Sequence, residues 1–419
     1  MSRKESVPRA SQVVHSHIYM IHISSVQKTV ITFAFACIFF SGTGAYVHAK
    51  DLEVAGWIPY WRDEQGIKDA TKNIKQIDSV YPFAFVAQPD GSIKDLAGLE
   101  SSSWKKFFRL ARSRDVEVIP TIMWSDGASM HTVLSNSESR KLHEDVIVAM
   151  VKKGGYDGVG IDYEGKKSET KDSFSLFLTE LKKKLGNKTL TCTLEARTPP
   201  DSLYKEVPKT LEYSNDYAVI GKVCDRIEIM AYDQQRADIK LNAAKAGQPY
   251  MPVSDVDWVR KVVDLAVESL PKEKIFLGIA TYGHHYQVTV SPDWYRDYKK
   301  IGSLNVPDIL DVAKDYKVKP SENRAGEMSA TYIPKSAKFK FPKNLKIPKD
   351  TTSGNKVAAQ ALAYANETGK TITFNMLWWS DAGAMKDKID LSKEFGLAGV
   401  AFFKFDGEED SKIWKLLPK

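Results

Sequence analysis

Short apolar runs alternate with amphipathic segments along the chain from about residue 50 onward. The apolar runs have the length and the Val, Ile and Phe content of buried strands. Eight of them predict strands at residues 53–60, 79–86, 116–123, 158–163, 189–194, 226–231, 275–281 and 399–405. Helical spacing of apolar residues is clearest at 102–113, 137–153, 170–185, 256–269 and 387–395. This alternation predicts a parallel sheet with crossover helices.

The number of strands favours a closed barrel over an open sheet. The G-x-G-x-x-G motif of dinucleotide-binding sheets is absent after the first strand. We therefore predict an α/β fold, a (β/α)8 TIM barrel, whose functional residues follow the carboxyl ends of the strands. More than 100 residues separate the seventh and eighth strands, which is too long for a crossover. A small α+β insertion is therefore predicted at roughly 285–370.

The first 49 residues have the pattern of an export signal. An apolar run at 29–42 (TVITFAFACIFFSG) follows Lys28, and Val47-His48-Ala49 is a small-residue cleavage pattern. An uncleaved anchor is the alternative, although the run is shorter than the ~20 residues that a membrane span needs. We expect residues 50–419 to form a secreted or cell-envelope protein without stable membrane insertion.

Charge and cysteine content narrow the classes of function. The net charge of +7 falls to +4 without residues 1–49, which is too mild to predict nucleic-acid binding. The Lys-rich stretch 334–350 predicts a solvated loop or edge hairpin, with attraction to an anionic cell-wall polymer as the alternative. His and Cys lack metal-ligand spacing, so we expect no metal and no cofactor. Whether Cys192 and Cys224 pair stays open.

The fourth predicted strand ends in two acidic residues that share one face. In the segment 156–164 (YDGVGIDYE), side chains two residues apart point to the same side, which groups Gly160, Asp162 and Glu164. The apolar residues between them face the other way, toward the helices. Burying a carboxylate pair is costly and indicates chemistry. The alternative is a solvated strand end that caps the next helix.

The sixth predicted strand carries a second motif. In 226–233 (RIEIMAYD), Glu228, Met230 and Tyr232 share a face, and a tyrosine hydroxyl at a barrel mouth needs a polar partner. The pattern DGxxxDxE together with Met-x-Tyr-Asp resembles glycoside hydrolase family 18, the chitinase-like family. The resemblance extends over residues 53–414 and includes Gly56-Trp57, Thr281-Tyr282-Gly283 and the last strand.

The resemblance implies a role for each motif residue. Glu164 would protonate the glycosidic oxygen and then activate water, while the substrate's own acetamide replaces a protein nucleophile. Asp162 would hold the acetamide N–H, and its charge would raise the pKa of Glu164. Tyr232 would position the acetamide carbonyl. Subsite lining is expected from Met230, Asp233, Trp57, Phe403, Trp124 and Tyr282, and Asp157 is expected to be structural.

Three departures from the family pattern stand out. Gly160 replaces an Asp on the face of Asp162, and Glu228 is expected to form a salt bridge or, alternatively, to supply a substitute carboxylate. Phe403 replaces a Trp at the floor of the central subsite, and the third strand lacks Ser-x-Gly-Gly. These departures are similar to the bacterial spore and cell-wall branch of the family.

The sequence therefore predicts an exported retaining glycosidase. Its expected substrate is a β-1,4-linked polysaccharide containing N-acetylglucosamine, either peptidoglycan or chitin, cleaved by substrate-assisted catalysis. A catalytically silent, chitinase-like lectin is the alternative, and a purely structural barrel is a third possibility. We expect a monomer.

Overall fold

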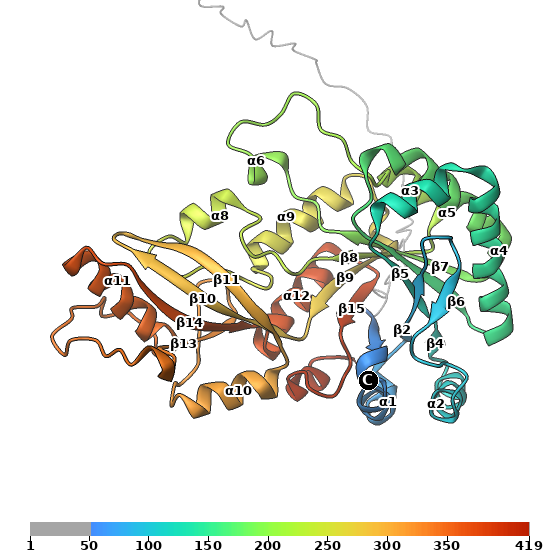
Figure 1. Cartoon of the computed structure of the whole chain (residues 1–419). Coiled ribbons are helices and arrows are strands. Elements are labelled where there is room, and N and C mark those ends of the chain that lie inside the picture. Colours follow the sequence, from blue (N-terminus) through green and yellow to red (C-terminus); the bar gives the residue numbers. More distant parts are fainter. Residues whose placement is uncertain (1–51, 419) are drawn as a thin grey trace, which may run out of the picture. The chain divides into compact units, whose positions relative to one another are not determined.

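Eight parallel strand positions close into a barrel (Figure 1). The structure, a computed structural model, describes residues 52–418, so the expected export signal lies outside the described residues. β1 pairs with both β2 and β15, which closes the ring and confirms the predicted TIM barrel. The strands are β1 (Glu53–Pro59), β2 (Ser79–Ala87), β4 (Glu117–Val118), β5 (Thr121–Trp124), β6 (Gly158–Tyr163), β7 (Thr189–Glu195), β8 (Arg226–Met230), β9 (Ile275–Ala280) and β15 (Gly399–Phe403).

Helices cover the outside of the barrel (Figure 1). The Asn136 side chain begins α4 by accepting from the N–H groups of Glu138 and Ser139, and Gly155 at φ +60° ends it. In residues 52–418, no helix is both long and apolar enough to cross a membrane. The covering helices are α1 (Asp63–Lys72), α2 (Ser102–Arg112), α3 (Gly127–Ser135), α4 (Ser137–Gly154), α5 (Lys171–Leu185), α7 (Tyr217–Val223), α9 (Val256–Val267) and α12 (Ala382–Phe395).

The third barrel strand differs from the prediction. Instead of one strand at 116–123, it consists of β4 and β5, separated by Ile119 and Pro120. Proline has no N–H to donate to a ladder, which interrupts the pairing. β2 extends into a hairpin with β3 (Ile93–Asp95), which the sequence pattern did not predict.

The two faces of the barrel strands bury different partners, as alternation predicts. Trp57, Tyr81 and Phe276 belong to a cluster inside the barrel. On β6 the opposite face packs outward, where the Tyr163 ring stacks on Phe177 of α5 with 5.7 Å between ring centres. Even residues of β6 are therefore free to face the interior and the mouth.

The long interval after β9 folds as a second, antiparallel sheet beside the barrel (Figure 1). Its strand order is β11-β10-β14-β13-β12, and it extends from residue 283 to 379, slightly wider than the expected 285–370. Its elements are β10 (Gly283–Ser291), β11 (Trp294–Leu304), α10 (Val306–Asp315), β12 (Ser321–Glu322), β13 (Met328–Tyr332), α11 (Lys356–Thr368) and β14 (Ile372–Trp379).

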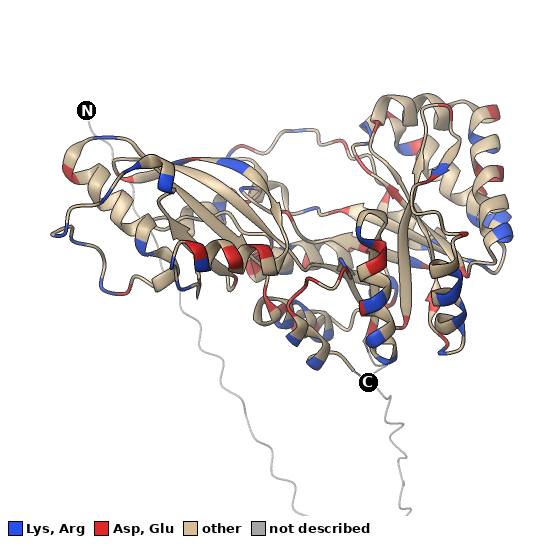
Figure 2. Cartoon of the chain, turned by 60° about the horizontal axis from the view of Figure 1, so that its bottom comes forward, with Lys and Arg blue, Asp and Glu red and all other residues tan. Residues whose placement is uncertain are grey.

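The Lys-rich stretch 334–350 is a loop of this insertion, not a hairpin (Figure 2). All six of its lysines are exposed. Phe339 and Phe341 turn inward and pack on Tyr364 of α11, with ring centres 5.2 and 6.2 Å away. The loop therefore has a small apolar anchor and a solvated basic side.

Glu327 ties the insertion to the barrel. Its fully buried carboxylate accepts hydrogen bonds from the N–H groups of Val253 (2.9 Å) and Ser254 (3.0 Å) and from Nε1 of Trp378 (2.6 Å). Lys388 of α12 lies 3.9 Å away and is also buried. Burial raises the pKa of Glu327 and lowers that of Lys388. Glu327 and Lys388 therefore each supply the opposite charge that the other needs, and the three N–H donors have the Glu327 carboxylate as their acceptor.

Replacing Glu327 by Gln should destabilise the protein by about 3–5 kcal/mol, because an amide NH2 would face N–H donors and Lys388 would lose its partner. Urea unfolding followed by tryptophan fluorescence measures the change. Glu322→Gln, on the exposed edge strand β12, is the matched control and should change stability by less than about 0.5 kcal/mol. Equal stability of both variants would contradict the assigned role of Glu327.

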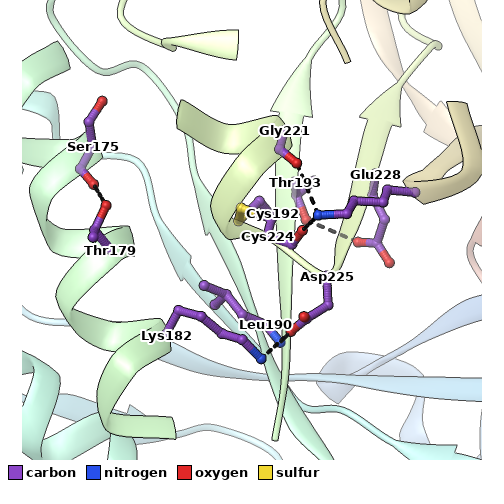
Figure 3. Close-up of a disulfide and its surroundings, with 11 residues drawn as sticks. Ser175, Thr179, Lys182, Leu190, Cys192, Thr193, Gly221, Cys224, Asp225 and Glu228 are labelled. Carbon is purple, nitrogen blue, oxygen red and sulfur yellow. Dashed lines mark hydrogen bonds and ion pairs between the residues drawn. A yellow bond between two sulfur atoms is a disulfide. The ribbon is translucent and has the colours of Figure 1, made fainter. Parts of the chain in front are cut away.

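Cys192 and Cys224 form a disulfide, which settles the pairing that the sequence left open (Figure 3). The bond joins β7 to the residue that follows α7, across 32 residues of chain. Close by, Nζ of Lys274 donates to the carbonyl oxygens of Gly221 (3.0 Å) and Cys224 (2.9 Å). The start of β8 is thus held covalently and by hydrogen bonds.

Removing this disulfide with the double variant Cys192→Ala and Cys224→Ala should lower the free energy of unfolding by about 3–4 kcal/mol, as expected for a loop of this length. Denaturant unfolding of the variant and of the oxidised protein measures the difference. The reductant dithiothreitol should destabilise the parent protein and leave the variant unaffected. A reductant effect on both would assign the loss to something other than this bond.

Candidate active site

Asp162 and Glu164 occupy the end of β6 at the barrel mouth. Asp162 is 5% exposed, whereas Glu164, the first residue after the strand, is exposed to solvent. The Glu164 N–H donates to the carbonyl oxygen of Trp124 at 2.8 Å, which continues the ladder between β5 and β6. The backbone of the exposed acid is therefore fixed by the barrel.

The Asp162 carboxyl is poorly compensated. Its Oδ1 is buried and has no hydrogen-bond partner among the described residues. Burial raises its pKa well above the usual range, and the charges of Glu164 and Glu228 add to the shift. Lys166 opposes it. Such a group binds a proton readily, or takes a hydrogen-bond donor from a ligand.

Glu164 also has a raised pKa. Partial desolvation is the main cause, the negative charge of Glu195 is the second, and Lys166 again acts in the opposite direction. The sequence motif pointed to Asp162 as the neighbouring charge, but the largest charge effect on Glu164 comes from Glu195. An acid with this environment stays protonated to higher pH than an ordinary Glu.

Glu195, the last residue of β7, holds the turn that follows Glu164. Its Oε1 accepts from the Gly165 N–H (3.1 Å), and its Oε2 accepts from Nδ2 of Asn215 (3.0 Å). Oε2 also lies 3.6 Å from Nζ of Lys166, which donates to the carbonyl oxygen of Tyr163. Sequence reasoning missed Glu195. Its place at the carboxyl end of a barrel strand was the available signal.

Tyr232, beyond the end of β8, lies among aromatic rings. Its ring centre is 6.0 Å from that of Phe403 and 6.4 Å from that of Tyr282. Burial raises the pKa of the Tyr232 hydroxyl well above its ordinary value, and the nearby charge of Asp162 adds to the effect. The hydroxyl therefore stays protonated and can donate a hydrogen bond. Met230 ends β8 and is half-buried.

Asp233 is held by the insertion. Its Oδ1 lies 2.6 Å from Nε2 of His284 on β10, and Nδ1 of His284 contacts Oγ of Ser303 at 3.2 Å. Burial by itself would raise the pKa of Asp233, but the hydrogen bond and charge of His284 lower it below the ordinary value. One side of the candidate site is thus positioned from outside the barrel.

The space at Gly160 is limited by a buried hydrogen bond. β5 pairs with β6 so that Thr121 lies opposite Gly160, and Oγ1 of Thr121 accepts from Nε1 of Trp57 at 3.1 Å. A Cβ atom at position 160 would lie 3.0 Å from this Oγ1. Trp57 is 2% exposed and contributes to the floor, where the Phe403 ring lies 5.8 Å from it. Gly160, where the family pattern has an Asp, therefore faces the hydrogen-bonded pair of Trp57 and Thr121.

Glu228 does not form the expected salt bridge. Among residues 52–418 it has no Lys or Arg nitrogen at ion-pair distance. It is buried and accepts from Oγ1 of Thr193 at 3.1 Å (Figure 3). The nearest Arg of the strand, Arg226, instead pairs with Glu53 and Glu117. Burial raises the pKa of Glu228 to about 7. Arg226 lies at the start of β8, two residues before Glu228, and its guanidinium pairs with two other acids, which explains the difference.

Neither of the two remaining expected residues, Trp124 and Asp157, is exposed to solvent. Trp124, expected to line a subsite, is 3% exposed, donates to Oγ of Ser129 and packs on Tyr163 with 5.3 Å between ring centres, so its ring lies on the outward side of the strands. Asp157 accepts from the Val118 N–H at 2.9 Å, between two barrel strands. Trp61 is 48% exposed. It is the most accessible tryptophan near the mouth.

Two cavities open at this end of the barrel. The first, of about 430 Å³, has Trp61, Arg62, Asp233, Tyr282, Phe403 and Lys404 in its lining. The second, of about 370 Å³, has Lys166, Glu195, Arg197, Tyr204, Tyr213 and Trp258 in its lining. The two cavities share no lining residue, so they are two separate spaces at the barrel mouth. Within residues 52–418, no group of three or more His, Cys, Asp or Glu side chains could hold a metal ion.

A buried Asp and an exposed Glu at the end of the fourth barrel strand thus lie at the same mouth as a Tyr beyond the sixth. Residues 17–408 match the family described as glycosyl hydrolases family 18, and the chain belongs to this family. This confirms the resemblance on which the sequence interpretation rested.

Several relatives come from Bacillus species. An uncharacterized glycosylase of Bacillus subtilis (strain 168) is 23% identical over 296 residues, which cover 70% of each chain. A cortical fragment-lytic enzyme of Bacillus anthracis is 25% identical over 272 residues, 65% of this chain and 51% of that enzyme. These matches confirm the likeness to the spore and cell-wall branch.

Solved structures share the fold. The spore cortex-lytic enzyme SleL of Bacillus megaterium QM B1551 has a TM-score of 0.63 at 21% identity, covering 87% of this chain and 73% of that chain. A class V chitinase of Pseudomonas fluorescens Pf-5 has a TM-score of 0.64 at 18% identity, covering 87% and 98%.

Glu195→Gln should lower the pKa of Glu164, because it removes the largest charge that raises this pKa and leaves Lys166 uncompensated. Titration of 13C-labelled Glu carboxyl carbons by NMR measures the shift, with Glu164→Gln assigning the resonance. Glu169→Gln, an exposed residue paired with Lys167, is the control and should leave the titration unchanged. An unmoved Glu164 pKa in the Glu195 variant would overturn this electrostatic account.

Proposed function

We propose that this protein is an exported glycosidase that hydrolyses β-1,4-linked polysaccharide containing N-acetylglucosamine, with retention and by substrate-assisted catalysis. The observation that carries the proposal is the Asp162 carboxyl. It is buried beside an exposed acid, and its Oδ1 has no partner among the described residues. A substrate acetamide N–H would give this oxygen the donor that the protein does not supply.

In this mechanism Glu164 begins protonated and donates its proton to the glycosidic oxygen. Its raised pKa and its exposed position support that role. The acetamide oxygen of the substrate attacks the anomeric carbon as the glycosidic bond breaks, so that no protein nucleophile is required. Glu164 then accepts a proton from the water that opens the cyclic intermediate.

Asp162 and Tyr232 act on the acetamide. As positive charge develops on the acetamide nitrogen, the Asp162 carboxyl becomes easier to ionise, so its stabilising effect is greatest where the charge is greatest. The protonated Tyr232 hydroxyl donates to the acetamide oxygen and aligns it for attack. Glu228, electrostatically coupled to Asp162, takes the place of the carboxylate missing at Gly160.

The other expected residues shape the subsites. Phe403 and Tyr282 enclose the sugar ring, and Trp57 supports Phe403 from below. Asp233 and Met230 line the wall beyond β8. Trp124 acts through its backbone: its carbonyl oxygen accepts a hydrogen bond from the Glu164 N–H and holds the Glu164 backbone in place.

Cell-wall glycan is the favoured polymer, with chitin as the second candidate. The similarity to proteins named cortical fragment-lytic and spore cortex-lytic enzymes supports the first, and the similarity to a class V chitinase supports the second. The Cys192–Cys224 disulfide supports export, because such bonds persist in oxidising compartments.

Glu164→Gln should lower kcat on both chito-oligosaccharides and purified peptidoglycan by about 10²–10⁴-fold, because the general acid is lost. Reducing-end release measures activity, and proton NMR of the first products should show the β anomer. Glu169→Gln, on the exposed turn beyond Glu164, is the matched control and should keep full activity.

Sugar binding without any Glu164-dependent cleavage of either polymer would identify a lectin instead. Initial release of the α anomer would reject the substrate-assisted mechanism while leaving a glycosidase in place.

A further inference from the structure

Arg197 lies in the second cavity and, among the residues that the structure describes, has no acidic side chain at ion-pair distance. The residue follows β7 by two positions and is half-buried. Its only hydrogen bond within residues 52–418 runs from Nη2 to the carbonyl oxygen of Asn215, at 3.1 Å. A guanidinium carries five N–H donors. Most of them are therefore available to a ligand in the cavity.

Two tyrosine rings hold the guanidinium in place. Its central carbon lies 3.8 Å from the ring centre of Tyr213 and 4.0 Å from that of Tyr217. Rings at these distances cover the faces of the planar group, which leaves the donors at its edge. A cation fixed before ligand binding loses little conformational entropy when it binds.

The other charges of the cavity differ in their surroundings: Lys166 has an acidic partner, whereas Glu212 is exposed to solvent and has no Lys or Arg at ion-pair distance among the described residues. Glu195 faces Lys166 at 3.6 Å, and Glu212 accepts a hydrogen bond from Oγ of Ser168 at 2.8 Å. Arg197 is the cation of this lining without an acid at ion-pair distance. A planar anion that accepts two parallel hydrogen bonds fits a guanidinium edge, and a carboxylate has this geometry.

The cavity adjoins the candidate catalytic residues. Lys166 and Glu195 line it, and the Glu195 carboxylate holds the N–H of Gly165, the residue after Glu164. A sugar bound at Glu164 would therefore bring its substituents toward Arg197. The exposed side chains of Leu203 and Tyr204 extend the same wall.

We propose that Arg197 and its cavity bind a carboxylate carried by a substituent of the substrate glycan, so that the enzyme prefers acidic wall glycan to neutral chitin. This inference rests on the proposed glycosidase function. The carboxylate comes either from the lactyl ether of a muramic-acid residue or from a peptide attached to it. Both sources present the same group to the guanidinium.

Binding is measured by calorimetry in the Glu164→Gln background, so that it does not depend on cleavage. The ligands are glycan strands freed of peptide, the same strands with their lactyl carboxylates converted to methyl amides, strands with peptides attached, and chito-oligosaccharides. Peptide-free strands should bind about 10-fold or more tightly than their methyl amides. Arg197→Gln should remove this difference, and Arg197→Lys should restore part of it.

Chito-oligosaccharide binding should change less than about 2-fold in Arg197→Gln, and Arg236→Gln, an exposed Arg outside this cavity, should behave like the parent. Arg197 dependence confined to strands with peptides would assign the carboxylate to the peptide. Equal loss of all four ligands would make Arg197 structural and overturn the proposal, as would equal binding of acid and amide by the parent combined with no Arg197 dependence for strands with peptides. Cleavage of none of the glycans by the unsubstituted protein would reject the proposed function alone.

Discussion

The barrel mouth is organised by one constraint: the Asp162 carboxyl group is buried and largely shielded from water. Asp162 lies near the carboxyl end of β6, at the barrel mouth. Within residues 52–418 its Oδ1 has no hydrogen-bond partner, and Glu164 and Glu228 are nearby. Such a group would be costly in a loosely packed protein. It is tolerated here because the closed ladder of parallel strands fixes every backbone position around it. The hydrogen-bonded side chains of Trp57 and Thr121 limit the space at Gly160, and Lys166 supplies a nearby positive charge.

Local pattern was enough to predict the barrel and the motif row. Period-two alternation placed Asp162 and Glu164 on one face, and helical spacing located α2, α4, α5 and α9 to within two residues. The split of the third strand at Pro120 is a backbone effect that apolar content conceals. The extra hairpin strand β3 is too short to produce a period.

Partners from distant parts of the chain were not predictable. Glu195 acts on Glu164 from the next strand, 31 positions along the chain, and only the barrel geometry brings them together. Glu327 was missed for the same reason, since its hydrogen-bond donors come from two separate segments, Val253-Ser254 and the strand that contains Trp378. The prediction of a salt bridge for Glu228 was wrong because strand alternation predicts the face on which a side chain lies, and not its depth along the barrel. Arg226 and Glu228 share a face but lie at different levels of the barrel.

The hydrogen bond between Asp233 and His284 crosses from the barrel to the second sheet. The insertion therefore helps to position Asp233 in the candidate site. A chimaera that exchanged residues 283–379 for the corresponding segment of a relative would inherit a different neighbour for Asp233. Recombination between family members thus has a natural boundary here: the Met-x-Tyr-Asp strand and the second sheet have to be exchanged as one unit.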